Sequence, residues 1–120
     1  MAGSGERTRR LIERLENAEV PIDSQISAAM QSIDVSDFTD YDLEPFWYDR
    51  PLVFLETCKG GVKTISAPHM IATMLHHLEL SSGQEVLILG AKGGYIAALI
   101  AHIVGPEGGV VVVDPSLEVV

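Results

Sequence analysis

The 120-residue chain contains few cysteines and few basic residues. Cys58 is its single cysteine, so the chain cannot form an internal disulfide, and a reducing compartment is expected. Eight Lys and Arg residues stand against 17 Asp and Glu residues, which gives a formal net charge of −9. This excess of negative charge argues against nucleic acid or an anionic membrane surface as a partner.

The sequence also lacks long apolar runs. No uninterrupted run is long enough to span a bilayer, and the first ten residues do not contain the apolar core of a secretory signal. Hydrophobic residues nevertheless make up 47% of the chain, enough for the core of one domain. We therefore expect a soluble protein of the cytoplasm.

The first half of the chain predicts helices and an acidic segment. Apolar residues recur at helical spacing within residues 6–19, and Asp23 or Ser24 is suited to cap a second helix. Residues 34–49 then carry six carboxylates among aromatic residues. A cation site is one interpretation, but the spacing lacks the glycine of an EF-hand loop. A solvated acidic segment, anchored by its aromatic side chains, is the preferred interpretation. The expected anchors are Phe38, Phe46 and Trp47.

A hairpin and a helix are predicted next. Two β-prone runs within residues 52–66 flank Lys59-Gly60-Gly61, as in a β-hairpin. Pro68 then opens a helix that extends to about residue 80. The predicted buried stripe of this helix consists of Met70, Ile71, Met74, Leu75 and Leu78.

The last third of the chain has the order strand, glycine-rich turn, helix, strand and acid. Residues 86–89 and 110–113 are apolar throughout, as in parallel strands covered on both faces, and residues 95–104 have helical periodicity. This order predicts a βαβ unit of the dinucleotide-binding type and hence an α/β fold. Gly90 and Asp114 lie 24 residues apart, close to the spacing of glycine and ribose-binding acid in that fingerprint. The pattern predicts a nucleotide-like cofactor site, and the alternative is a structural turn with an incidental acid.

Two longer stretches resemble the protein-L-isoaspartate O-methyltransferase family. KTISAPHMIATMLHHLEL, residues 63–80, is similar to the family's Thr-Ile-Ser and Ala-Pro-His-Met segment, and GQEVLILGAKGGYIAALIAHIVG, residues 83–105, is similar to its S-adenosylmethionine loop. YDRPL and AAMQSIDVSDF, residues 48–52 and 28–38, also fall in the family's order. The resemblance covers nearly the whole chain from about residue 8. It implies an incomplete Rossmann-like methyltransferase fold, with N-terminal helices, a hairpin and the first βαβ unit of a parallel sheet.

The resemblance further implies methyl transfer from S-adenosylmethionine to isoaspartyl carboxylates in damaged proteins. By matching position, Ser66 would be the active-site hydroxyl beside the acceptor carboxylate, with Thr64 next to it. The residues expected to hold the cofactor are Gly90, Ala91, Gly93, Gly94 and Asp114. Because a carboxylate is already a competent nucleophile, the reaction mainly requires positioning, and no strong base is expected.

Three positions depart from the family's pattern. Lys92 replaces the middle glycine of Gly-x-Gly-x-Gly, where a side chain resists a positive φ and its charge opposes a sulfonium. Ile88 replaces an acid two residues before the first glycine, and Lys63 replaces the usual glutamine after a longer hairpin link. These departures leave open whether cofactor binding is kept or lost.

Two hypotheses follow for function. In the first, a helical region of residues 1–50 and a hairpin with a truncated cofactor-type unit of residues 51–120 form one domain of a protein-repair methyltransferase. In the second, the chain is a non-catalytic relative that acts as a protein-interaction or scaffold subunit. Two parallel strands cannot bury both of their apolar faces, so we expect a piece of a longer enzyme, a homo-oligomer or a hetero-complex. No metal site is expected, because His69 and His76 have no evident third ligand and fit a solvated or substrate-side histidine face.

Overall fold

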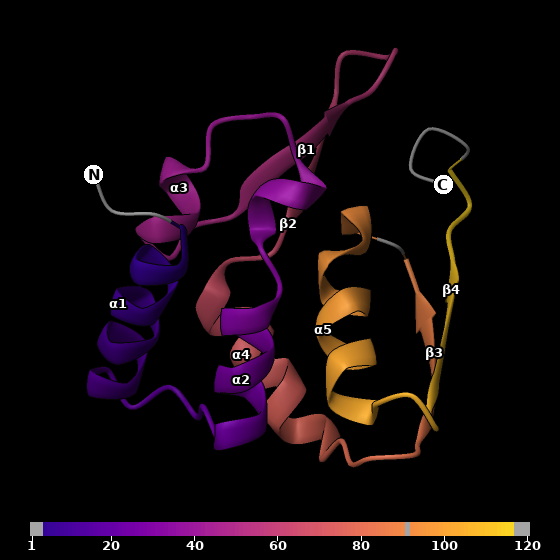
Figure 1. The fold of residues 1–120 in the computed structure, drawn as a ribbon. Helices are drawn as coiled ribbons and strands as arrows, with labels where there is room; N and C mark the ends of the chain where they lie inside the picture. Colours follow the sequence, from indigo (N-terminus) through magenta and orange to yellow (C-terminus); the bar gives the residue numbers. More distant parts are fainter. Residues whose placement is uncertain (1–3, 91, 117–120) are drawn as a thin grey trace.

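The computed structural model describes residues 4–90 and 92–116, and it places the helices on one side of a two-stranded parallel sheet (Figure 1). The elements in chain order are α1 (Ser4–Asn17), α2 (Ser24–Ser32), η1 (Val35–Phe38), α3 (Glu44–Trp47), β1 (Leu52–Glu56), β2 (Val62–Ile65), α4 (Pro68–Leu78), β3 (Glu85–Leu89), η2 (Lys92–Gly94), α5 (Tyr95–Val104) and β4 (Gly109–Val113). Among these described residues, no helix has the length and apolar character needed to cross a membrane.

The N-terminal helices form as predicted. Leu11, Ile12 and Leu15 of α1 are buried on one side of that helix. Asp23 is the residue that caps α2, because its Oδ1 accepts a hydrogen bond from the N–H of Ile26 at 2.9 Å. The cap satisfies one of the amides that every helix leaves unpaired at its start.

Aromatic side chains anchor the acidic segment as predicted. Phe46 and Trp47 are 1% and 3% exposed, and their rings meet edge to face at 5.3 Å. Phe38 is partly buried and contacts the ring of Tyr95 edge to face at 5.7 Å. Such contacts stabilise aromatic pairs beyond the burial of their area, so the carboxylates can stay in solvent while the chain is held down.

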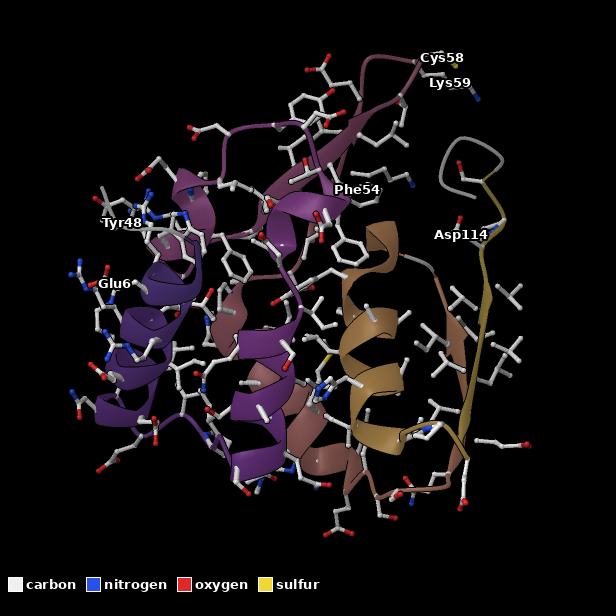
Figure 2. All side chains as sticks on the ribbon, viewed as in Figure 1. Glu6, Tyr48, Phe54, Cys58, Lys59 and Asp114 are labelled. Atoms are coloured by element: carbon white, nitrogen blue, oxygen red, sulfur yellow. The ribbon has the colours of Figure 1, made fainter. Side chains whose placement is uncertain are left out.

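The predicted hairpin is also confirmed. β1 and β2 pair antiparallel, from Leu52 opposite Ile65 to Glu56 opposite Val62. The register shifts between Val53 and Leu55, as at a β-bulge. The turn projects from the molecule with Cys58 and Lys59 at its tip (Figure 2).

The predicted buried stripe of α4 is wrong for three residues. Ile71 and Leu75 are buried together with Ala72, but Met70, Met74 and Leu78 are 47%, 38% and 53% exposed. The helix packs against α2 and offers its other side to solvent. The apolar stripe of the helix is therefore wider than the surface that packs against it. Sequence periodicity shows which side of a helix is apolar, but not how much of that side is buried.

β3 and β4 are adjacent parallel strands, as predicted, with Leu87 opposite Val111 and Leu89 opposite Val113. Val86, Ile88 and Val110 pack against the core on the side where α5 lies. The side chains that point the other way form the open sheet face, and they are 62%, 78%, 61% and 51% exposed. They are Leu87, Leu89, Val111 and Val113. The predicted cover on both faces is therefore found on one face only within the described residues.

One hydrophobic core joins the two predicted regions of the chain. It includes Leu11 and Met30 from the N-terminal helices and Ile71 and Leu99 from α4 and α5. The hairpin enters this core through Leu52 and Ile65, which are both 0% exposed. The hairpin and the turn after β3 are thereby held at the same end of the molecule (Figure 1).

Candidate functional site

The turn after β3 brings Gly90 beside the end of β4. The N–H of Gly90 donates a hydrogen bond to the carbonyl of Val113 at 2.7 Å, which extends the parallel ladder by one step. Asp114 is the next residue after Val113, so the glycine and the acid predicted to act together are neighbours in space. Gly90 has a φ of +96°, a backbone conformation that side-chain-bearing residues rarely adopt.

Two further glycines complete the turn. Gly93 and Gly94 have φ values of +75° and +91°, and Gly94 is the N-cap of α5. A Cβ on Gly93 would lie 3.0 Å from the ring of Phe54, so a larger residue here would also have to displace that ring. A positive φ was expected to be unfavourable at Lys92. The structure avoids this, because the positive φ angles of the turn fall on glycines and Gly93 is the non-helical residue of η2. Ala91, the remaining predicted cofactor residue of the turn, lies outside the described residues.

A hollow of about 370 Å³ opens between the hairpin and this turn, and we call it the glycine-loop hollow. Its lining residues come from β1, β2 and the ends of β3 and β4: Phe54, Val62, Lys63, Thr64, Gly90, Asp114 and Pro115. Figure 2 shows Phe54 near the start of α5 and Asp114 just beyond β4. The Asp114 carboxylate accepts a hydrogen bond from the N–H of Ser116 at 2.8 Å. Lys63, where the resemblance expects glutamine, places a cationic side chain in this hollow.

A second hollow of about 330 Å³ lies on the other side of β2, and we call it the serine hollow. It is lined by Asp49, Pro51, Thr64, Ser66, Ala67, His69 and Met70. Thr64 therefore lines both hollows, while Ser66 lines only the second. The structure brings together the two predicted catalytic residues, and it places one of them beside Gly90 and Asp114. Gly93 and Gly94 shape the turn without lining either hollow.

Asp49 and His69 form a pair that the sequence pattern did not indicate. The Asp49 Oδ1 accepts a hydrogen bond from the backbone N–H of His69 at 2.7 Å, and its Oδ2 lies 2.9 Å from Nδ1 of the same residue. A carboxylate only accepts hydrogen bonds, so Nδ1 carries the proton in this contact. Asp49 itself has an unusual φ of +58°. The two residues are 20 positions apart on different elements, so periodicity gives no signal for the pair.

Tyr95 fixes the start of α5 beneath the turn. Its side chain is 1% exposed and meets the rings of Phe38 and Phe46, each at 5.7 Å. Burial, and to a smaller degree the negative charge of Asp34, raises the pKa of the Tyr95 hydroxyl well above its ordinary value. The hydroxyl therefore stays neutral, and the helix start is held by an uncharged, well-packed group.

Comparison with protein families gives one match over almost the whole chain. The profile of the family described as Protein-L-isoaspartate(D-aspartate) O-methyltransferase (PCMT) matches residues 6–120. The match includes the predicted site residues Thr64, Ser66, Gly90 and Asp114.

Individual relatives carry the name of the same family. A protein-L-isoaspartate O-methyltransferase of Methanothrix thermoacetophila is 40% identical over 115 residues, covering 95% of this chain and 51% of the relative. One of Methanopyrus kandleri is 38% identical over 106 residues, covering 88% of this chain and 45% of the relative. The chain thus spans about half the length of the curated relatives it matches.

Solved structures agree in fold. A structure described as a protein-L-isoaspartate O-methyltransferase aligns with a TM-score of 0.80 and 28% identity, covering 93% of this chain and 35% of the other. A second, from Plasmodium falciparum and described as a complex with S-adenosyl-L-homocysteine, aligns with a TM-score of 0.77 and 22% identity. It covers 94% of this chain and 51% of the other, and at that identity it supports the fold alone.

Proposed function

This chain belongs to the protein-L-isoaspartate O-methyltransferase family, and from that premise we propose that it forms the cofactor-binding part of an S-adenosylmethionine-dependent enzyme. The proposed reaction is methylation of isoaspartyl carboxylates in damaged proteins. The observation that carries the proposal is the position of Thr64, which lines both the glycine-loop hollow and the serine hollow. A methyl donor and a carboxylate acceptor need two adjoining sites with a shared wall, and Thr64 is part of that wall.

The glycine-loop hollow fits the cofactor in size and in chemistry. Its volume of about 370 Å³ lies within the range usual for small-molecule sites. The Asp114 carboxylate can accept hydrogen bonds from ribose hydroxyls, and Gly90 lets the backbone come close to the ligand. Lys63 offers a cation for the carboxylate end of the cofactor. When bound, S-adenosylmethionine supplies an electrophilic methyl group.

The serine hollow supplies the groups that orient an acceptor carboxylate. The Ser66 hydroxyl can donate a hydrogen bond to one carboxylate oxygen and leave the other oxygen to react. Asp49 also lines this hollow, and its negative charge would repel an acceptor carboxylate. The hydrogen bonds from His69 engage both oxygens of Asp49, and these donors partly offset that repulsion.

Calorimetric titration with S-adenosylhomocysteine tests the donor site on the chain as it stands. We expect measurable binding, and we expect Asp114→Asn to weaken it about tenfold, because one charge-assisted hydrogen bond contributes on the order of 1.5 kcal/mol. Asp40→Asn is the matched control, since it removes the same charge from an exposed residue that lines neither hollow. No binding by the unaltered chain, or equal weakening by both variants, would contradict the proposal.

The acceptor site is tested separately with an isoaspartyl peptide and methyl-labelled S-adenosylmethionine. Ser66→Ala should lower methyl incorporation by about tenfold while leaving S-adenosylhomocysteine binding unchanged, because the hydroxyl positions the acceptor only. Equal methylation by the variant and the unaltered chain would remove Ser66 from the proposed mechanism.

A second candidate function is that of a protein-interaction or scaffold subunit. The open sheet face favours it, because four exposed apolar side chains on adjacent strands mark a surface that another polypeptide covers. In this alternative the partner is a second copy of the chain. Light scattering checks it: a dimer that Leu89→Lys converts to monomer supports the alternative, and a stable monomer at high concentration contradicts it.

A further inference from the structure

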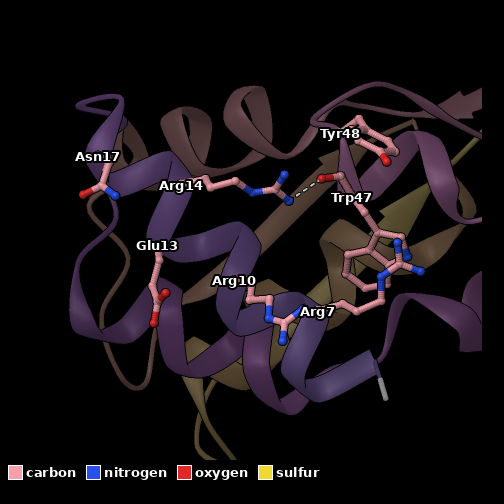
Figure 3. A pocket seen from close by; sticks show the side chains of 7 residues that line it. All are labelled: Arg7, Arg10, Glu13, Arg14, Asn17, Trp47 and Tyr48. Carbon is pink, nitrogen blue, oxygen red and sulfur yellow. Dashed lines mark hydrogen bonds between the residues drawn. The ribbon is translucent and has the colours of Figure 1, made fainter. Parts of the chain in front are cut away.

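A third hollow, of about 420 Å³, lies between α1 and α3, away from the two hollows described above. Three arginines of α1 line it, and two of them, Arg7 and Arg14, extend toward the consecutive aromatic residues Trp47 and Tyr48 (Figure 3). We call it the arginine hollow, and the residues that define it are Arg7, Arg10, Arg14, Trp47 and Tyr48. Of the carboxylates in the described part of the chain, Glu13 alone lines it.

Positive charge is concentrated in the middle of this helix, which also carries Glu6 and Glu16 nearer its two ends. Residues 7–14 hold four of the eight Lys and Arg residues and one of the 17 Asp and Glu residues. The rest of the chain therefore holds four basic residues (8 − 4) and 16 acidic ones (17 − 1). An anionic group is repelled over most of this surface and attracted here, which gives the hollow a selectivity that the net charge of −9 hides.

The three arginines are held in different ways. Arg7 lies over the Trp47 ring, 5.1 Å from its centroid, and binds both oxygens of Glu44 at 2.8 and 3.1 Å. This bidentate contact raises the pKa of Arg7 and lowers the pKa of Glu44, so the pair is ionised and Arg7 is held in place where it lines the hollow. Arg10 is paired with Glu6 at 2.7 Å on the outer surface of the helix.

Arg14 differs from the other two arginines because it contacts a neutral carbonyl group and not a carboxylate. Its Nη2 donates a hydrogen bond to the carbonyl oxygen of Trp47 at 2.5 Å, and this contact points the guanidinium into the hollow (Figure 3). A guanidinium has five N–H donors in a planar fork that matches a carboxylate. The carbonyl orients the group without cancelling its charge, so Arg14 keeps both the charge and the geometry for an anionic ligand.

We propose that the arginine hollow binds an acidic side chain, Asp or Glu, of a protein segment, with its carboxylate on Arg14 and the charge of Arg10 nearby. Tyr48 is 66% exposed at the rim and offers an aromatic surface for the peptide backbone beside that side chain. The hollow accommodates side chains rather than a polyanion, and the acidic surface around it disfavours nucleic acid. Tyr48 and Asp49 are consecutive, and Asp49 lines the serine hollow. The segment therefore belongs to the protein that presents the acceptor, a step that rests on the proposed function, whereas the binding itself does not.

Trp47 makes the test direct, because it is the only tryptophan of the chain and it lines the hollow. The probe is the blocked peptide acetyl-Gly-Glu-Glu-Gly-amide, titrated while the tryptophan emission is recorded, with the Gly-Gln-Gln-Gly peptide as the neutral control. We expect a saturable change with the acidic peptide, an affinity about tenfold lower for the neutral peptide, and a loss of affinity with added salt.

Variants of α1 distinguish a specific site from general attraction. Arg14→Gln should weaken peptide binding about tenfold, and Arg10→Gln, whose guanidinium is already paired with Glu6, about threefold. Arg9→Gln is the matched control, because it removes the same charge from the same helix at a side chain that does not line the hollow, and its effect should be less than about twofold. Thermal melting of each variant establishes that it is folded. If Arg14→Gln does not fold, Arg10→Gln still tests the proposal.

Three results would overturn the proposal: equal binding of the two peptides, equal weakening by the α1 control and the hollow variants, or displacement of the tryptophan signal by inorganic phosphate alone. S-adenosylhomocysteine titration of the same variants separates this proposal from the proposed function. Cofactor binding that persists in Arg14→Gln while peptide binding is lost supports the arginine hollow as a separate site. If the unaltered chain binds the acidic peptide specifically but does not bind S-adenosylhomocysteine, the arginine hollow stands as a peptide site and the proposed enzymatic function is wrong.

Discussion

The two faces of the β3–β4 sheet have nearly the same amino-acid composition and different surroundings. On the covered face, Val86, Ile88 and Val110 pack against the core. On the open sheet face, Leu87 and Leu89 are 62% and 78% exposed. Side chains that alternate along a single strand, with the same apolar character, thus end in opposite environments.

The difference shows that apolar residues in a strand indicate that a face is to be buried. They do not indicate which element buries it. The covered face packs against α5, which follows β3 after η2 and is brought back over the sheet by the glycine turn. The open face would need a cover that the described residues do not contain. Stability should therefore depend on the covered face and on the helices behind it, while association should depend on the open face. Substitutions placed at increasing distance from the covered face test this.

The largest effect is expected within the sheet itself. Ile88→Ala should lower the free energy of unfolding by about 3 kcal/mol, because it removes a side chain that packs against the core and leaves a gap. Leu89→Ala, one residue along the strand and 78% exposed, should change it by less than about 0.5 kcal/mol. Urea unfolding measures both. Equal losses would show that the two faces are covered alike in solution.

The next effect is expected where α5 begins. Gly93→Ala should destabilise the protein by about 2 kcal/mol, because alanine resists the φ of +75° and its Cβ would meet the Phe54 ring at 3.0 Å. Gly60→Ala is the control at the hairpin tip, with a φ of +85° and no atom within 4 Å of the added Cβ. It should cost only about 1 kcal/mol. Equal melting temperatures for the two variants would remove the Phe54 contact from the account.

A smaller effect is expected at α2, which packs against α5 on the side away from the sheet. Asp23→Ala removes the cap that accepts the Ile26 N–H and should lower the free energy of unfolding by about 1 kcal/mol. Ser24→Ala tests the alternative cap that the sequence allowed, and its effect should stay below about 0.5 kcal/mol. Chemical denaturation of both variants decides between the caps, and a larger loss for Ser24→Ala would reverse the assignment.

The smallest effect is expected at α1, where Glu44 binds Arg7. The pKa of Glu44 is lowered from its ordinary value of 4.5 by the hydrogen bond from Arg7, so the pair stabilises the fold fully above that value. The stabilisation is lost as the pH falls through the lowered pKa, because the protonated carboxyl no longer attracts the guanidinium. Arg7→Gln should remove this part of the acid dependence of the melting temperature. A melting curve against pH that is the same for the variant would contradict the assignment.

The sequence predicted local structure well where the signal is local. The α5 helix and the parallel strands around it follow from periodicity and apolar runs, and the turn between them follows from its glycines. The neighbouring positions of Gly90 and Asp114 could also be predicted, because the carboxyl ends of adjacent parallel strands lie at one edge of a sheet. By contrast, periodicity predicted Met70, Met74 and Leu78 as buried, and the structure exposes them.

The candidate site divides in the same way. Ser66 and Thr64 came from the resemblance of a short segment, but only the structure shows that Thr64 lines two hollows. The contact of Asp49 with His69 joins the turn after α3 to the first turn of α4, and no local sequence pattern indicates it. Likewise, the carbonyl of Trp47 orients Arg14 across 33 residues.

The sequence by itself determined most of the helices and strands, which family the chain resembles and where its glycines must lie, because these depend on residues a few positions apart. The short helices η1 and α3 within the acidic segment were not predicted. Only the tertiary structure decided which apolar faces are covered, that Asp49 contacts His69, and where the arginines of α1 point. Those outcomes depend on which distant elements pack together, and packing is set by the fit of whole surfaces rather than by the character of any one segment.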